Sequence, residues 1–235
     1  MLQPEKKTKG FSLIELLVVI ALFGILASVA YPSFSSWMAT RNTNDAVTKM
    51  ESAFKSITTQ IQRGVYPFGQ VHVSNGQNEV VIVTRGLGQE NFNQRRLTLN
   101  CSADEGDCDA SNINYFKSEY ATVNLAPGGE EDAPTTGAIC FSKDGKYYSG
   151  AGEFAASGSV DTVIFICSRP EALEFSDGNS PFCQVEIDDT DEFNPVVKPL
   201  YVDSKNFYSI SWSIFGTIVT EKWSSKDGGK WIERQ

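Results

Sequence analysis

The chain has 235 residues and an acidic balance, with 29 Asp and Glu against 20 Lys and Arg and a formal net charge of −9. Nucleic-acid binding draws on clustered Lys and Arg, so this composition argues against a nucleic-acid partner. The only histidine is His72. A single histidine argues against a histidine-based catalytic centre and against a zinc site with several histidine ligands.

The N-terminal segment combines a basic start with a long apolar run. Lys6, Lys7 and Lys9 outnumber Glu5, a balance that holds an N-terminus on the cytoplasmic side of a membrane. Residues 11–31 number 21, enough at 1.5 Å per residue to cross a hydrocarbon core about 30 Å thick. The pattern predicts a transmembrane helix over residues 11–31, with the rest of the chain on the far side.

Glu15 lies inside this predicted span. A carboxylate in a membrane helix is disfavoured by roughly 2.5 to 3.5 kcal/mol on insertion scales, so such a residue indicates a functional role and a positively charged partner.

The run Lys-Gly-Phe-Ser-Leu-Ile-Glu-Leu at residues 9–16 resembles the cleavage and methylation signature of type IV pilins and type II secretion pseudopilins. The resemblance implies that residues 1–10 are a leader peptide, which prepilin peptidase removes after Gly10. Phe11 would become the new, N-methylated terminus. In the filaments of this superfamily, Glu15 would neutralise the Phe11 amine of a neighbouring subunit, and the helix dipole favours a carboxylate at that position.

Two other interpretations of the N-terminus stay open. The small residues Ala27-Ser28-Val29-Ala30 could end an ordinary secretory signal cut before Tyr31, or the segment could be a plain signal-anchor on an unrelated periplasmic domain. Glu15 would interrupt the apolar region of either, which favours the pilin interpretation.

Residues 32–64 are predicted to continue the helix as an amphipathic segment. No proline or glycine occurs from Ser33 to Arg63, and apolar residues recur at spacings of three and four: Val47, Met50, Phe54, Ile57 and Ile61. Gly64 followed by Pro67 supplies a stop. Gly24 and Pro32 predict a kink, either a simple bend or a stretch that melts during assembly.

Residues 65–235 are predicted to form a β-rich head. Short runs rich in Val, Ile, Phe, Tyr and Thr indicate strands at residues 79–84, 95–101, 138–141, 146–148, 162–167, 207–213 and 216–222. Asp144-Gly145 indicates a hairpin. Residues 102–114, 128–137 and 169–199 are polar and are expected to be surface loops.

Three late strand patterns, within residues 137–146, 163–167 and 208–218, resemble those of the GspH/FimT minor-pilin family. The resemblance implies an α+β fold in which a long N-terminal helix packs on a two-sheet antiparallel head. Some members bind DNA through a Gly-Arg-x-Arg motif, but the matching positions here are Gly216-Thr217-Ile218-Val219. Both arginines are absent, and removing the leader with its +2 charge leaves −11. Arg95-Arg96, or Lys222 with Lys226 and Lys230, could still form local basic patches.

Five cysteines in a head facing an oxidising periplasm predict disulfides. The favoured pairs are Cys101 with Cys108 and Cys167 with Cys183, which leaves Cys140 as a buried free thiol. A Cys140 to Cys167 bond is the competing pairing.

Candidate sites for catalysis and metal binding are sparse. His72 has no nucleophile motif nearby and is expected to be a surface residue of a strand or loop. The acidic segments 104–109 and 186–192 could offer oxygen ligands to calcium, but neither has the spacing of a calcium loop. We therefore expect no catalytic residues, no metal and no cofactor.

The sequence indicates a minor type IV pilin near the tip of the pilus. Its partners would be other pilins, prepilin peptidase and the inner-membrane assembly platform. The head would face the periplasm from a single-pass inner-membrane helix and then enter an extracellular pilus. The alternatives are a type II secretion pseudopilin of the GspH kind, which would form a periplasmic pseudopilus, and a DNA-uptake or adhesive module borne on the pilus.

Overall fold

The computed structural model describes residues 12–76, 79–95, 112–124, 136–142, 162–168, 183–188, 196–200, 204–212 and 217–234. The chain divides between Ala39 and Thr40 into two compact units. The first unit contains the N-terminal part of helix α1 (Leu13–Gln62), and the second contains the rest of that helix and the head. The fold is α+β, with antiparallel sheets after the helix, as the sequence predicted.

Helix α1 ends at the predicted stop. Gly64 has a φ of 75°, in the left-handed region that favours glycine. The amide of Val65 donates to the carbonyl of Gln60 at 3.0 Å, and the amide of Gly64 donates to the carbonyl of Ile61 at 2.9 Å. These two bonds form a Schellman motif, which satisfies carbonyls that the helix end would leave unpaired.

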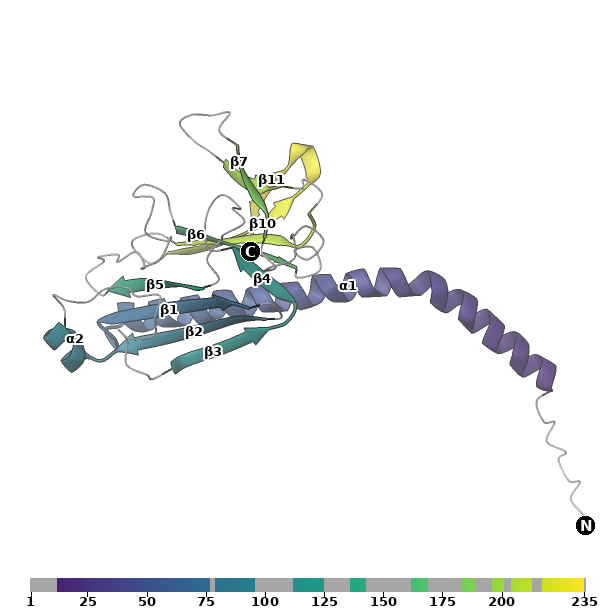
Figure 1. Ribbon diagram of the computed structural model, residues 1–235, viewed down its shortest axis with the longest axis horizontal. Helices are drawn as coiled ribbons and strands as arrows, with labels where there is room; N and C mark the ends of the chain where they lie inside the picture. Colours follow the sequence, from purple (N-terminus) through teal and green to yellow (C-terminus); the bar gives the residue numbers. More distant parts are fainter. Residues whose placement is uncertain are drawn as a thin grey trace, which may run out of the picture. The chain divides into compact units, whose positions relative to one another are not determined.

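Sheet A has the strand order β3-β2-β1-β5. Its members are β1 (Phe68–Asn75), β2 (Val80–Leu87), β3 (Asn112–Ser118) and β5 (Thr136–Ser142), and all neighbours are antiparallel. A short helix, α2 (Gln89–Arg95), follows β2. Figure 1 shows β1, β2 and β3 side by side along the C-terminal part of α1.

Sheet B has the order β11-β10-β9-β6-β4 and is also antiparallel. Its strands are β4 (Ala121–Asn124), β6 (Thr162–Ser168), β9 (Phe207–Trp212), β10 (Ile218–Ser224) and β11 (Lys230–Glu233). A 3-10 turn, η2 (Lys226–Gly228), links the last two strands. A third, two-stranded sheet pairs β7 (Val185–Asp188) with β8 (Val196–Pro199).

The main core lies where the apolar stripe of α1 meets the inner faces of sheets A and B. Every residue of the predicted stripe is buried, and Phe54 is only 1% exposed. The same cluster contains Val71 and Ile82 from sheet A and Ile166 and Ile210 from sheet B. Sheet A approaches the helix closely at Gly69, because a Cβ there would stand 2.7 Å from Cδ1 of Ile61. The helix is therefore the common surface on which both sheets are built.

A buried polar contact ties sheet A to sheet B. The side-chain amide of Asn75, at the end of β1, donates to the carbonyl of Val123 at 3.1 Å. The hydroxyl of Thr122 donates to Oδ1 of Asn75 at 2.7 Å. Since all these groups are buried, each would be costly if left unpaired, and the contact fixes β4 beside β1.

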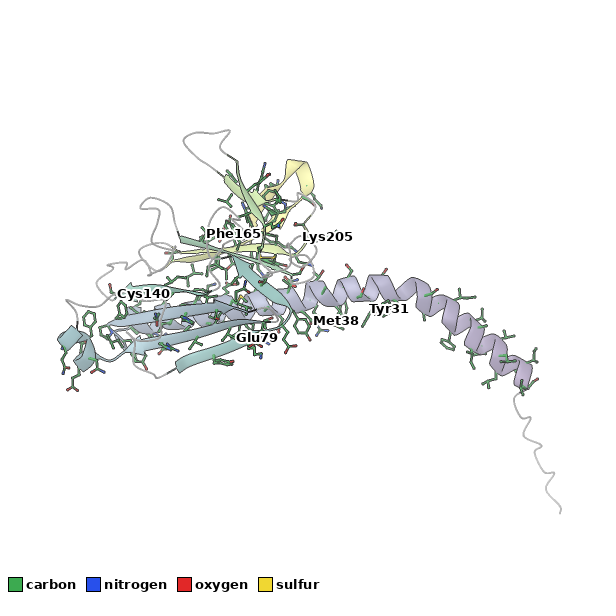
Figure 2. The ribbon with its side chains drawn as sticks, in the orientation of Figure 1. Tyr31, Met38, Glu79, Cys140, Phe165 and Lys205 are labelled. Atoms are coloured by element: carbon green, nitrogen blue, oxygen red, sulfur yellow. A yellow bond between two sulfur atoms is a disulfide. The ribbon has the colours of Figure 1, made fainter. Side chains whose placement is uncertain are left out.

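A second core lies under the β7–β8 sheet. It is built from four aromatic rings, Phe165, Phe207, Trp223 and Trp231, with centroids of contacting pairs 5.3 to 6.2 Å apart. Val185 and Val197 pack against these rings, and the indole of Trp231 donates to the carbonyl of Val197 at 2.8 Å. Figure 2 labels Phe165, the residue of this cluster that comes from β6.

Several predicted elements need correction. Residue 95 was expected to start a strand but ends helix α2, and residues 96–101 lie outside the described ranges. Residues 169–199 were expected to be one surface loop but contain β7 and β8. Strand β1 falls where no strand was predicted. The predicted hairpin at Asp144-Gly145 and the strand at residues 146–148 are outside the described residues.

Replacing Phe54 with alanine should lower the free energy of unfolding by about 3 to 5 kcal/mol, because the ring is lost from the core shared by both sheets. The control is Lys55→Ala, whose exposed side chain bonds only Glu51 and should cost about 0.5 kcal/mol or less. Denaturant titration of the full chain in detergent, followed by tryptophan fluorescence, measures both. Equal losses for the two variants would contradict the helix-centred core.

Candidate assembly interface

The N-terminal part of α1 exposes many large apolar side chains in the single subunit. Exposed fractions of the large apolar residues run from 39% at Val19 to 76% at Leu13. Figure 2 shows the side chains standing away from this part of the helix, past Tyr31. The large exposed residues are Leu13, Ile14, Leu16, Leu17, Val18, Val19, Ile20, Leu22, Phe23, Ile25, Leu26, Tyr31, Phe34 and Trp37. A helix that is apolar on all sides requires lipid or other protein around it.

Glu15 is the only charged side chain between Ser12 and Thr40. It lies in the first turn of α1 and is exposed. The first helical hydrogen bond runs from the amide of Leu16 to the carbonyl of Ser12, at 3.2 Å. The carboxylate therefore stands at the positive end of the helix dipole, where a negative charge is favoured.

The length and hydropathy required of a membrane span are not met by any single helix among the described residues. Two helical segments, Leu13–Ser28 and Ser33–Gln62, meet these requirements only when they are taken together. Gly24 and Pro32 both fall within α1, and the kink assigned to them stays a prediction.

The N-terminal residues match a family model described as the prokaryotic N-terminal methylation motif, over residues 6–31. A fimbrial protein of Moraxella nonliquefaciens is 43% identical over 158 residues, which cover 66% of this chain and 72% of that protein. A type IV major pilin of Neisseria gonorrhoeae is 38% identical over 148 residues, covering 55% of this chain and 66% of that protein. The chain belongs to the type IV pilin superfamily.

A third relative of this pilin is the type IV major pilin protein PilA of Myxococcus xanthus. It is 27% identical over 166 residues, which cover 69% of this chain and 59% of the relative. No solved structure matches. The pilin assignment implies that this chain assembles with other pilin subunits in a pilus.

The predicted processing residues lie at or beyond the edge of the described structure. Gly10 and Phe11 are outside the described residues, whereas Glu15 is inside them, one turn into the helix. Cleavage at Gly10, methylation of Phe11 and docking through Glu15 stay predictions.

The cysteines partly follow the prediction. Cys167 at the end of β6 forms a disulfide with Cys183, with Cα atoms 5.6 Å apart, which is the second of the predicted pairs. The predicted free thiol at Cys140 is wrong, because this buried cysteine of β5 is also disulfide-bonded. Its bonding partner, and both members of the predicted Cys101 to Cys108 pair, lie outside the described residues. The competing bond from Cys140 to Cys167 does not form.

His72 is also placed differently from the prediction. It lies in β1 with 9% of its surface exposed, so it is a buried residue and not a surface one. Its neighbours across the strands are Val83 and Ala138. Buried polar residues share that face of sheet A, with Gln70 directly opposite Arg85. A strand that is buried on both faces lacks the clean alternation from which its burial could be predicted.

The acidic segments fall in different settings. Residues 104–109 are outside the described ranges, while Glu186 and Asp188 are part of β7 and not of a loop. Glu186 forms an ion pair with Lys198 of β8 at 3.2 Å. No group of three or more His, Cys, Asp or Glu side chains that could hold a metal ion occurs within the described ranges.

The exposed ion pairs of the head are weak determinants of its structure. Lys117 of β3 donates a hydrogen bond to Glu79, and this bond raises the pKa of Lys117 above its ordinary value. Asp45 and Lys49 pair along α1 at 2.7 Å. Because these groups are exposed to solvent, water and salt screen the pairs.

Mass spectrometry of the unreduced, full-length chain should recover the Cys167–Cys183 pair and should find Cys140 in a second disulfide. Since each disulfide takes two of the five cysteines, one thiol should react with an alkylating reagent before reduction. Alkylation of Cys140 without reduction would contradict the bonded state of this residue.

Proposed function

We propose that this pilin is a minor, low-copy subunit of a type IV pilus, positioned near the tip. The main observation in support is the exposed apolar surface from Leu13 to Trp37, which has one carboxylate, Glu15, at its start. Such a surface is stable only in a bilayer or packed against other helices of the same kind. A subunit that moves from the bilayer into the pilus needs one helix that is stable both in lipid and against other helices.

Processing supplies the positive partner of Glu15 in this proposal. Prepilin peptidase cleaves after Gly10, and the Phe11 amine becomes the methylated N-terminus. The match to the methylation motif over residues 6–31 supports this step. The new amine carries a positive charge among unpaired helical N–H groups, so it needs a carboxylate nearby. Glu15 of a neighbouring subunit provides that carboxylate and sets the register between the two helices.

The proposed cellular location of the protein is inferred from helix α1 and the residues before it. Before assembly the chain is a single-pass inner-membrane protein whose head faces the periplasm, and the assembly platform then moves it into the pilus. The basic residues before Phe11 support this orientation, because positive charges stay on the cytoplasmic side.

Low copy number is supported by the charge and the connections of the head. Without the leader the chain carries a net charge of −11, so repeated copies along a shaft would repel one another. Every position of a shaft must also accept identical neighbours, which long connections hinder. The resemblance of residues 137–146, 163–167 and 208–218 to minor pilins of the GspH/FimT kind points the same way.

Replacing Glu15 with leucine should leave the amount of protein in the membrane fraction unchanged or raised, since a charge is removed from the span. The amount in sheared pili should fall at least tenfold, because the Phe11 amine loses its partner and the cost of an unpaired charge exceeds about 1.4 kcal/mol. Leu16→Ile is the matched control and should assemble normally. Equal recovery of the Glu15→Leu and wild-type proteins from pili would argue against docking through Glu15.

The copy number is measured by quantitative mass spectrometry of sheared pili. The proposal requires this chain at a small fraction of the main subunit, and a comparable amount would identify it as a major pilin.

A deletion strain assayed for surface pili and for protein secretion tests the pseudopilin alternative. Loss of secretion with pili intact would replace the proposal. Binding of DNA or host surfaces by wild-type pili, lost in the deletion strain while pili remain, would favour a binding module.

A further inference from the structure

Three aromatic side chains gather where the long apolar run of α1 ends. Tyr31, Phe34 and Trp37 recur at a spacing of three, whereas residues 13–30 contain only one aromatic residue, Phe23. The exposed fractions of the three are 75%, 56% and 53%, so large ring surfaces are left uncovered in the single subunit. We call Tyr31, Phe34 and Trp37 the Tyr31–Trp37 cluster.

The members of the Tyr31–Trp37 cluster occupy a short length of the helix. Residues three apart in an α-helix are neighbours on its surface. The rings of Phe34 and Trp37 contact each other, with centroids 5.8 Å apart and planes inclined by 37°. From Tyr31 to Trp37 the helix rises about 9 Å, which is close to the thickness of one headgroup layer of a bilayer, about 5 to 8 Å.

The helix changes from apolar to polar across this cluster. Residues 13–30 contain only two hydroxyl or charged side chains, Glu15 and Ser28. Residues 33–41 contain five, and the last of them, Arg41, is the first charge after Glu15. Tyrosine and tryptophan combine an apolar ring with a polar hydroxyl or N–H group, so they favour the boundary between hydrocarbon and water. The cluster therefore stands at such a boundary in the sequence.

The distance from the basic N-terminus agrees with the thickness of one bilayer. A helix over residues 11–31 rises about 30 Å, which equals the thickness of the hydrocarbon core. With Tyr31 at the periplasmic edge of the core, the cytoplasmic edge falls near Phe11, directly after the basic residues. Glu15 then lies about 6 Å inside the cytoplasmic edge, where a carboxylate costs less than at the centre of the span. One depth of insertion therefore suits both Glu15 and the aromatic residues.

We propose that the Tyr31–Trp37 cluster binds the headgroup layer of the periplasmic leaflet and fixes how deeply the unassembled pilin sits in the inner membrane. The inference rests on the proposed function, since it requires the single-pass location before assembly. The headgroup layer accepts the exposed rings and offers oxygen acceptors to the hydroxyl of Tyr31 and the indole N–H of Trp37. Rings buried among neighbouring helices would instead be shielded from lipid.

Quenching by brominated lipids measures the depth of Trp37 in the membrane. The full chain is placed in phosphatidylcholine vesicles whose bromine atoms lie either near the headgroup end or near the methyl end of the acyl chains. Subtracting the fluorescence of Trp37→Phe from that of the wild type removes the signal of the three other tryptophans. Shallow bromine should quench the Trp37 signal about twofold more than deep bromine. Equal quenching, stronger quenching by deep bromine, or no quenching by either lipid would overturn the proposal.

The control places a tryptophan near the middle of the predicted span, as Leu22→Trp in the Trp37→Phe chain. Residue 22 lies about 14 Å from Tyr31 along the helix, so its signal should be quenched most by deep bromine. If this control behaves as expected and Trp37 does not, the proposed membrane location stands and the role of the cluster is wrong. If neither tryptophan is quenched, the chain is not inserted, and the proposed membrane location fails together with the inference.

The role in fixing depth is tested by combining Tyr31→Leu with Phe34→Leu. Leucine favours hydrocarbon over headgroups, so the helix should sink and the ratio of shallow to deep quenching of Trp37 should fall from about two to about one. Phe23→Leu is the matched control, because it also replaces an exposed aromatic ring but lies within the predicted hydrocarbon core. It should leave the ratio unchanged. An unchanged ratio in the double variant, at equal amounts of inserted protein, would overturn this role.

Discussion

The apolar stripe on the second half of helix α1 is the constraint on which the rest of this pilin depends. Its residues form one core with the inner faces of sheets A and B, so neither sheet can bury its apolar side without the helix. Gly69 lets β1 lie close to Ile61, because a Cβ at this position would stand 2.7 Å from Cδ1 of Ile61. A buried polar contact through Asn75 then joins the two sheets directly. The head is thus built around the second half of the same helix whose first half is exposed and apolar.

One helix meets two different requirements along its length. Before Thr40 it is apolar on all sides and has only Glu15 as a charge, which suits lipid or a bundle of similar helices. After Thr40 it is amphipathic and presents its apolar side to the head. The whole chain in turn is acidic, with a net charge of −9.

Strands with a strong local pattern could be predicted, and strands whose burial depends on their surroundings could not. The predictions at residues 138–141, 162–167 and 207–213 overlap β5, β6 and β9, where Val, Ile, Phe and Tyr dominate. Strand β1 was missed because Gly69, Gln70 and His72 are interspersed with its apolar residues, although both faces are buried. The β7–β8 sheet was missed because acidic residues and Pro199 lower its strand signal, while its stability comes from aromatic rings brought from other strands.

The sequence by itself determined the pilin signature at residues 9–16, the helix stop at Gly64 and the amphipathic stripe, because each is a pattern of near neighbours in the chain. Only the tertiary structure decided that Cys140 is bonded and that His72 is buried. It also placed Tyr208 against Asn44, 164 residues away along the chain. These contacts depend on which strands become neighbours, and that is fixed by packing of the whole head around the helix and not by local spacing.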